Sequence, residues 1–266
     1  MNIAELRKEP HLSVSSVNDY IECGLYYEFS RIEHLEPEFK SEALVFGTTI
    51  HRVLADFYQE KMIGHIMSDD ELQSLFETYW NEAEEDNSEI KYKEGRDFNT
   101  ALDEGKALLK AFSDNYPNDN FNILAIEEPF HFYIDGLETP IVGYIDLIEE
   151  DENGTIIITD HKTSSRAYCK NDVEKNFQLT VYYMAAKAKG FSDREILLKF
   201  DCLIKTKTPK FEQYYTKRTP IDEKRAIKKI TKVWEGIEQC IFIPDDGSWR
   251  CKDCSFRKNC DQWFIS

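Results

Sequence analysis

Two short segments joined by Asn153-Gly154 constrain the fold of this chain more than any other feature. Residues 140–149 and 155–161 are rich in β-branched and aromatic residues, which is typical of strands. An Asn-Gly pair between two such segments is a strong signal for a tight hairpin turn. The sequence therefore predicts that these two segments pair as antiparallel strands.

The rest of the chain predicts helices and strands in an order that fits an α/β fold. Apolar spacing and end signals predict helices, the first capped by a serine, at residues 13–30, 43–61, 172–189 and 220–240, with two or three more within 69–115. Further strands are expected at 121–134, 195–205 and 211–217. Residues 82–89 are expected to form a solvated loop or a frayed helix end. This order predicts a mixed sheet with helices on both sides, preceded by a helical segment.

The length and composition are those of a globular protein. The 266 residues can form one large domain or two small ones. No apolar run approaches the roughly 20 residues that a transmembrane helix needs. The first residues lack the apolar core of a secretory signal. We therefore expect a cytoplasmic protein whose seven cysteines stay reduced unless something binds them.

The net charge of −17 is unevenly distributed along the chain. Residues 1–160 hold 11 Lys and Arg against 36 Asp and Glu, a balance of −25, whereas residues 161–266 hold 22 against 14, a balance of +8. A DNA-facing surface can therefore come from the C-terminal half. Lysines on amphipathic helices are more often a solvated face, so charge alone leaves both interpretations open. The basic residues concerned are Lys205, Lys207, Lys210, Lys217, Arg218, Lys224, Arg225, Lys228, Lys229 and Lys232.

Two aspartates and a lysine lie in the predicted hairpin. Asp146 is in its first strand, and Asp160 and Lys162 are at the end of its second. Residues two apart in a strand point to the same face, and pairing across the turn can bring Asp146 alongside them. Adjacent carboxylates repel unless a cation lies between them, and such ligands suit Mg²⁺ or Mn²⁺, while a lysine can stabilise phosphate charge or orient water. The alternative is two turn aspartates with a lysine as their ion-pair partner.

Three of the cysteines, Cys251, Cys254 and Cys260, are closely spaced near the end of the chain. In a reducing compartment such clustering argues for a metal rather than for disulfides. Three ligands leave one position open, and Cys23, far upstream, is the candidate fourth. Four thiolates suit either structural Zn²⁺ or a [4Fe–4S] cluster. The other cysteines are interpreted as ordinary residues, the last two of them buried on a strand and a helix: Cys169, Cys202 and Cys240.

At these positions the sequence resembles a known family of nucleases. The segments Gly143–Asp146 and Ile157–Thr163 are similar to the core motif of the PD-(D/E)xK nuclease superfamily in its RecB-like branch. That branch includes helicase-linked nuclease domains, CRISPR spacer-adaptation nucleases and many phage exonucleases. Three further elements occur in the family's order, namely Gly47-x-x-x-His51, Gln178-x-x-x-Tyr182 and Cys23 with the tail cysteines. The resemblance covers about residues 13–260, and the motifs, each weak alone, are specific as an ordered set.

The resemblance implies a restriction-endonuclease-like α/β fold and divalent-metal-dependent hydrolysis of DNA. Lys162 would then position or activate the attacking water, and Gln178 and Tyr182 would line the active site and contact the substrate backbone or the lysine. The metal ligands implied are the side chains of His51, Asp146 and Asp160 and the backbone carbonyl of His161.

The resemblance also bears on the cysteines and on the domain organisation. One distant and three clustered cysteines occur in the iron–sulfur nucleases of this branch, which favours a [4Fe–4S] cluster over structural Zn²⁺. Its ligands would be Cys23, Cys251, Cys254 and Cys260. One nuclease domain, 1–266, would then consist of a helical part (about 1–118), a core (119–240) and a cluster-binding tail (241–266) joined to Cys23.

Local sequence leaves three assignments open. His51 lies on an amphipathic stripe, where a lone histidine is usually a core or rim residue. Gln178 and Tyr182 are one helical turn apart and share a face, which can also serve only to pack Tyr182 against the sheet. Glu127 or Glu128, on the strand before the hairpin, can add a further carboxylate, and the sequence does not decide which one faces inward.

The functional hypothesis is a single-strand-preferring DNA exonuclease in repair, recombination or processing. The alternative is a CRISPR spacer-adaptation nuclease or a nuclease subunit that depends on a helicase or CRISPR-integration partner. Because the sequence contains no G-x-x-x-x-G-K-[ST] phosphate-binding loop, we expect any unwinding to come from elsewhere. A second alternative is a non-catalytic DNA-binding module, which would be expected to lose one of Asp146, Asp160 and Lys162, yet all three are present.

Overall fold

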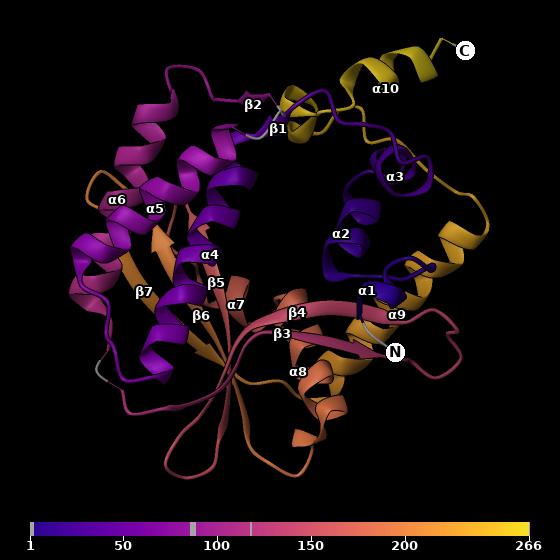
Figure 1. Ribbon diagram of the computed structural model, residues 1–266. Helices are drawn as coiled ribbons and strands as arrows, with labels where there is room; N and C mark the ends of the chain where they lie inside the picture. Colours follow the sequence, from indigo (N-terminus) through magenta and orange to yellow (C-terminus); the bar gives the residue numbers. More distant parts are fainter. Residues whose placement is uncertain (1–2, 86–88, 118, 266) are drawn as a thin grey trace.

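The computed structural model describes residues 3–85, 89–117 and 119–265. A five-stranded sheet lies at its centre, with helices against both faces (Figure 1). The order of the strands in the sheet is their order along the chain. The mixed α/β architecture predicted from the sequence is therefore confirmed. The strands are β3 (Asn122–Phe132), β4 (Ile141–Glu150), β5 (Ile156–Ser164), β6 (Ile196–Ile204) and β7 (Lys210–Thr216).

Strand directions follow the predicted connections. The pairs β3–β4, β4–β5 and β6–β7 are antiparallel, whereas β5 and β6 are parallel. The predicted hairpin is confirmed, with Glu150 opposite Ile156. In its turn, Gly154 has a φ of 82°, which glycine adopts without steric strain.

The two strands of this hairpin separate part-way along their length. Their Cα register runs from Glu150↔Ile156 only as far as Leu147↔Thr159. Strand β5, in contrast, continues beside β6 up to Ser164. The sheet is therefore unpaired between β4 and β5 at the next position along each strand, where Asp146 and Asp160 lie.

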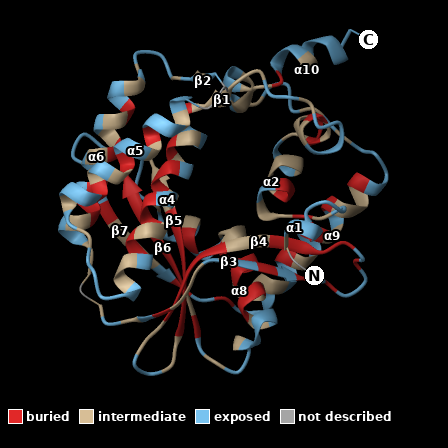
Figure 2. Cartoon of the chain, in the orientation of Figure 1, coloured by how far each residue is buried: buried red, intermediate tan, exposed pale blue. Residues whose placement is uncertain are grey.

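Helices cover the two faces of the sheet as separate groups. On one face, Phe46 and Phe112 share a core cluster with Leu147 and Leu203 of the sheet. On the other face, a second group of helices packs against strand residues that point to that side, such as Ile158. Figure 2 shows the buried residues in red along the strands and on the helix sides that face them. The first group is α4 (Glu42–Met62), α5 (Asp69–Glu85) and α6 (Phe98–Asn115), and the second is α8 (Phe177–Ala186) and α9 (Pro220–Glu238).

The remaining elements are short. They are α1 (Ile3–Leu6), α2 (Val14–Glu22), α3 (Gly24–Tyr27), η1 (Glu28–Ile32), β1 (Lys40–Ser41), β2 (Ile90–Lys91), α7 (Lys170–Glu174), η2 (Lys187–Phe191), η3 (Trp249–Asp253) and α10 (Arg257–Trp263). Of the segment predicted as loop or frayed helix, residues 82–85 belong to α5 and 86–88 lie outside the described residues. Among the described residues, no helix combines the length and apolar character needed to cross a membrane.

The helix predicted at residues 13–30 begins at its N-cap, Ser13, but is interrupted at Cys23. Cys23 has an extended backbone with φ −163°, and its Sγ accepts a hydrogen bond from Tyr26 N–H at 3.4 Å. The next residue, Gly24, donates its N–H to Ile243 O at 2.9 Å, and a Cβ at Gly24 would lie only 2.6 Å from Ile243 N. The prediction of one helix was wrong because the chain is broken there to pack against the C-terminal segment.

The helix predicted at 172–189 is also two helices, because Asn176 leaves the helical path and caps α8 by accepting Leu179 N–H. Cys202 is buried on β6, as predicted. Cys240 was predicted to be buried on a helix, and this was wrong. It is exposed just beyond the end of α9, where its φ of 55° has already ended the helix.

Candidate active site and cysteine cluster

The half-buried Lys162 and the buried Asp160 form an ion pair at the end of β5. Lys162 Nζ lies 2.6 Å from Asp160 Oδ2, and the Asp160 side chain is fully buried. Both residues point to the same face because they are two apart in the strand. The other oxygen, Asp160 Oδ1, is buried with no hydrogen-bond partner among the described residues. A buried carboxylate oxygen in this state is expected to have a ligand.

Asp146 fills the opening between β4 and β5. Its Oδ2 accepts a hydrogen bond from the backbone N–H of His161 at 2.8 Å, so it satisfies a donor that no longer pairs with β4. The histidine side chain of His161 points to the opposite face, where it is buried and stacked on Tyr58. The backbone of His161 thus faces Asp146, while its ring meets the ring of His51 edge to face, with 6.0 Å between the ring centroids.

Lys162 is held from the other side by α8. Gln178 Oε1 accepts a hydrogen bond from Lys162 Nζ at 2.7 Å, and Gln178 Nε2 donates to the Tyr182 hydroxyl at 2.9 Å. Tyr182 is almost fully buried. The structure thus brings Gln178 and Tyr182 together with the lysine, in a chain of hydrogen bonds that reaches α8 in its first turn.

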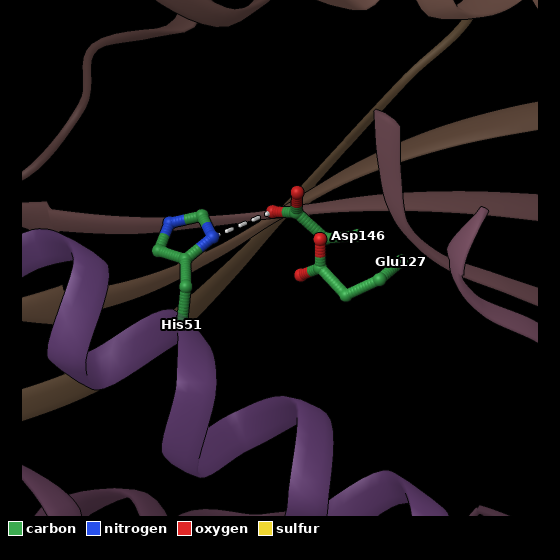
Figure 3. A group of neighbouring side chains, drawn as sticks. All are labelled: His51, Glu127 and Asp146. Carbon is green, nitrogen blue, oxygen red and sulfur yellow. Dashed lines mark ion pairs between the residues drawn. The ribbon is translucent and has the colours of Figure 1, made fainter. Parts of the chain in front are cut away.

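His51 reaches the site from α4, which packs on the opposite face of the sheet. Its Nδ1 lies 3.3 Å from Asp146 Oδ2 (Figure 3). One turn earlier, Gly47 lies close to β5, since a Cβ there would be 3.8 Å from Thr163 Oγ1. The opening between β4 and β5 is what lets a side chain from this helix meet residues on the other face.

A further carboxylate comes from β3. Glu127 lies at the β3 position opposite Asp146, and its backbone has a left-handed φ of 48°, which is a strained conformation for a residue other than glycine. Glu128 instead pairs with Lys189. Glu127 is therefore the glutamate that joins the site, a choice that the sequence left open because nothing local signals the strained backbone.

Glu127, His51 and Asp146 could hold one cation. Each offers a ligand atom, and these atoms all lie within 4.8 Å of one another (Figure 3). Such a set of two carboxylates and an imidazole suits Mg²⁺ or, because of the nitrogen, Mn²⁺. The group is the only one of its kind in the parts of the chain that the structure describes.

The electrostatics also favour a cation here. Burial raises the pKa of Asp146 well above its ordinary value, and the nearby Asp160 carboxylate raises it further. Burial and Asp160 also raise the pKa of Glu127. Burial lowers the pKa of His51, which keeps the imidazole neutral and available as a ligand. Three carboxylates thus share one nearby ammonium, that of Lys162. Burial lowers the pKa of Lys162, but the charges of Asp160 and Asp146 and the hydrogen bond to Asp160 together raise it above its ordinary value.

The sequence model of the PD-(D/E)XK nuclease superfamily matches residues 11–261 of the chain. The chain belongs to the PD-(D/E)XK nuclease superfamily. Members of this superfamily are metal-dependent nucleases, which agrees with a residue set that fits a divalent ion. No curated protein matches the sequence of this nuclease significantly.

A solved structure supports the same fold for the nuclease. It is similar to a candidate exonuclease from Eubacterium rectale, with a TM-score of 0.56 and 11% sequence identity, over 92% of this chain and 88% of that one. At that identity the likeness shows the restriction-endonuclease-like fold alone. The protein SSO0001 also matches, with a TM-score of 0.36, 16% identity and coverage of 91% of this chain and 92% of that one.

The four cysteines singled out in the sequence converge on one cavity of the nuclease, away from the carboxylates. Cys23, Cys251, Cys254 and Cys260 line it together with Leu25, Phe29 and Phe256, which form a small buried cluster. Burial raises the pKa of the Cys254 and Cys260 thiols. Among the other cysteines, Cys169 lies exposed at the start of α7.

The tail that carries these cysteines is tied to the helical part of the nuclease. Glu38 donates its N–H to Ser255 O at 3.0 Å, and its carboxylate pairs with Lys258 at 2.7 Å. Lys91 lies 3.6 Å from Asp253. The tail therefore connects α3, on one side of the molecule in Figure 1, to the segments beside α4 on the other.

Two basic residues predicted to face DNA do not lie on an open surface. Arg218 is buried, and its guanidinium donates to the carbonyls of Val173 and Asn176. Lys205 lies over the ring of Phe46 and pairs with Glu104 on the α4–α6 side of the sheet. The other members of that set remain candidates for nucleic-acid contacts.

Proposed function

We propose that this nuclease is a divalent-metal-dependent deoxyribonuclease of the RecB-like branch, and that it prefers single-stranded DNA and cleaves as an exonuclease. The observation that carries the proposal is the meeting of His51, Glu127 and Asp146 beside the Asp160–Lys162 ion pair. The donor set and the unpartnered oxygen of Asp160 fit a divalent ion, Mg²⁺ or Mn²⁺.

In this mechanism the metal ligands are His51, Glu127, Asp146, Asp160 and the backbone carbonyl of His161. A bound divalent ion supplies Lewis-acid stabilisation of the phosphate and of the leaving oxygen. Lys162 then orients the attacking water and stabilises charge on the phosphate. Asp160 and Gln178 fix the position of its ammonium group, which reduces the reorganisation needed during reaction.

The preference for a single strand is supported by the shape of the surface around Gln178. Two depressions, one lined by Arg166 and Tyr168 and the other by Arg31 and Tyr144, share Gln178 as a lining residue. Helix α2 borders both of them, so they follow one path past the active site. A path with cationic and aromatic side chains suits a flexible strand with unstacked bases.

We also propose that the four cysteines hold a [4Fe–4S] cluster, with structural Zn²⁺ as the alternative. Support for an inorganic centre comes from the convergence of all four cysteines on one cavity. The choice of iron–sulfur over zinc rests on the resemblance, in which one distant and three clustered cysteines bind the cluster. Metal analysis of anaerobically purified protein tests it: about four irons per chain are expected, and one zinc without iron would contradict the proposal.

Cleavage of end-labelled DNA tests the enzymatic function. Single- and double-stranded substrates would be incubated with Mg²⁺ or Mn²⁺ and anaerobically purified protein. Lys162→Ala is compared with Lys110→Ala, which removes an exposed lysine on α6. We expect metal-dependent cleavage that Lys162→Ala loses and Lys110→Ala keeps, with products that reveal the polarity. Cleavage of circular single strands would contradict the exonuclease assignment, and no cleavage by folded, metal-loaded wild type would contradict the enzyme itself.

A further inference from the structure

A polar depression of about 540 Å³ lies beside the active site. It is bordered by the loop after β5, by α7 and its connection to α8, and by α9. Gln178 forms part of its wall and also contacts Lys162, so the depression begins next to the reacting groups. Its cationic lining residues are Arg166, Lys175 and Lys229.

Two of these three cations are available to a ligand, whereas Arg166 lies 3.8 Å from the Asp172 carboxylate. Neither Lys175 nor Lys229 has an ion pair with a carboxylate in the part of the chain that the structure describes. The acidic residues of the depression are already engaged: Glu22 pairs with Arg250, and Asp172 accepts the Cys169 N–H. The depression is therefore cationic, although the chain as a whole carries a net charge of −17.

The depression extends along α9. A second hollow of about 280 Å³ is lined by Lys175, Phe177 and Lys229 as well, so the two share one wall. The Lys229 ammonium lies 4.7 Å from the centre of the Phe177 ring, a contact that leaves its positive charge uncompensated. Asp222, in the second hollow, is occupied as the capping partner of Thr219.

A buried arginine fixes the backbone that carries Lys175. Arg218 Nη2 donates to Val173 O at 3.0 Å and to Asn176 O at 3.1 Å, the carbonyls on either side of Lys175. Its Nε donates to Thr180 Oγ1 at 2.8 Å, which ties the same guanidinium to α8. The position of Lys175 relative to Gln178 is thus set before any ligand binds, which lowers the entropic cost of binding.

We propose that this depression is a strand subsite, in which Lys175 and Lys229 hold backbone phosphates of DNA next to the scissile one. The inference rests on the proposed function, since it places the scissile phosphate beside Lys162. Two unpaired ammonium groups in a polar hollow match the charge of a phosphodiester chain. The phosphate held can be internal or terminal, and both share this chemistry.

Charge reversal with a matched control tests the subsite. Lys175→Glu and Lys229→Glu would each be compared with Lys228→Glu, which makes the same change one residue along α9 but does not line the depression. Binding of a fluorescent single-stranded oligonucleotide is measured in EDTA, and cleavage is measured in Mn²⁺, over a range of salt concentrations. Thermal unfolding of each variant shows whether it is folded.

For each subsite variant we expect the Kd to rise about tenfold and the slope of log Kd against log salt to fall by about 0.7. We also expect KM to rise more than kcat falls, whereas Lys228→Glu shows less than half of each effect. Equal effects of Lys228→Glu and Lys229→Glu would overturn the subsite, because they would reflect net charge only. Suppose that wild type binds DNA more tightly than both subsite variants, that Lys228→Glu binds nearly as well as wild type, and that wild type cleaves no DNA. The proposed function then fails and the subsite stands.

The same variants identify the source of the phosphate. Oligonucleotides with 5′-phosphate, 3′-phosphate or only hydroxyl ends would be bound in parallel. A preference of wild type for one phosphorylated end, lost in Lys175→Glu and Lys229→Glu, supports a terminal phosphate in the subsite. Equal binding of all three, weakened equally in the variants, supports an internal phosphate. A phosphate-end preference that both variants keep would overturn the assignment of these lysines.

Discussion

Asp146 Oδ2 accepts the backbone N–H of His161 at 2.8 Å, across the opening where β4 and β5 separate. The same carboxylate lies 3.3 Å from His51 Nδ1. Asp146 therefore combines two roles, because it satisfies a buried backbone donor and contributes a negative oxygen to the proposed metal site. A substitution can separate these roles.

Asp146→Asn is expected to abolish metal-dependent cleavage while leaving the fold intact. The amide oxygen can still accept the His161 N–H, but it lacks the charge that a divalent ion requires. We expect Mn²⁺ affinity to fall more than about 100-fold, since loss of even an outer partner of a metal ligand costs 10–100-fold. Isothermal titration with Mn²⁺ and thermal unfolding measure the two effects. Mn²⁺ binding as tight as in wild type would contradict the ligand assignment.

Lys162→Met should destabilise the metal-free protein, and metal binding should then restore part of the loss. Without metal, the variant leaves the buried Asp160 carboxylate without its cation, and breaking a buried pair costs about 3–5 kcal/mol. Mn²⁺ at about 100 times its Kd should return about 2.7 kcal/mol through binding to the folded state. Denaturant unfolding with EDTA or Mn²⁺ measures both. Lys187→Met, which breaks an ion pair that is more exposed, is the control and should lose less than about 1 kcal/mol.

Much of the fold could be predicted because its signals are local. The hairpin follows from Asn153-Gly154 and the apolar segments on either side of it. Helix α4 follows from an apolar stripe whose spacing matches a helical turn. The same alternation rule places Asp160 and Lys162 on one face of β5, as the structure has them.

The rest of the site depends on contacts between distant segments. The left-handed backbone of Glu127 arises where β3 passes Asp146, and no residue near Glu127 signals it. The break before α8 depends on Arg218, some 40 residues later, which binds the freed carbonyls of Val173 and Asn176. In both places tertiary contacts override the local pattern, so the sequence alone does not predict them.

Glu127 offers a test of strain stored at the site. Glu127→Gly and Glu127→Gln both remove the carboxylate, and both should weaken Mn²⁺ binding. The glycine variant should be the more stable of the two by about 1 kcal/mol, because a left-handed φ is unfavourable for a residue with a Cβ. Denaturant unfolding of both variants in EDTA measures the difference.

The neighbouring position supplies the control for this prediction. Glu128 does not have a positive φ, so the order there should be reversed, with Glu128→Gly less stable than Glu128→Gln by about 0.5–1 kcal/mol. Both Glu128 variants lose the ion pair with Lys189, so this loss drops out of the difference in stability between them. If the glycine variant is less stable than the glutamine variant at both positions, the backbone of Glu127 is not strained.

A second buried charge cluster lies on the other face of the sheet, beneath His161. Lys199 Nζ lies 3.2 Å from Glu149 Oε2 and 3.6 Å from Asp201 Oδ2, and all three side chains are buried. Asp201 also accepts a hydrogen bond from Tyr58, the ring that stacks on His161. The cluster therefore supports the strand from which Asp160 and Lys162 extend.

Lys199→Met should be strongly destabilising, by about 3–5 kcal/mol, because it leaves two buried carboxylates without a cation. Lys217→Met is the matched control, since Lys217 is exposed and its pair with Glu195 is worth at most about 1 kcal/mol. Adding Glu149→Gln to Lys199→Met should recover part of the loss, because it removes one unpaired charge. Urea unfolding in EDTA measures all three. A loss at Lys199 no larger than at Lys217 would mean that water reaches this cluster and that it does not stabilise β5.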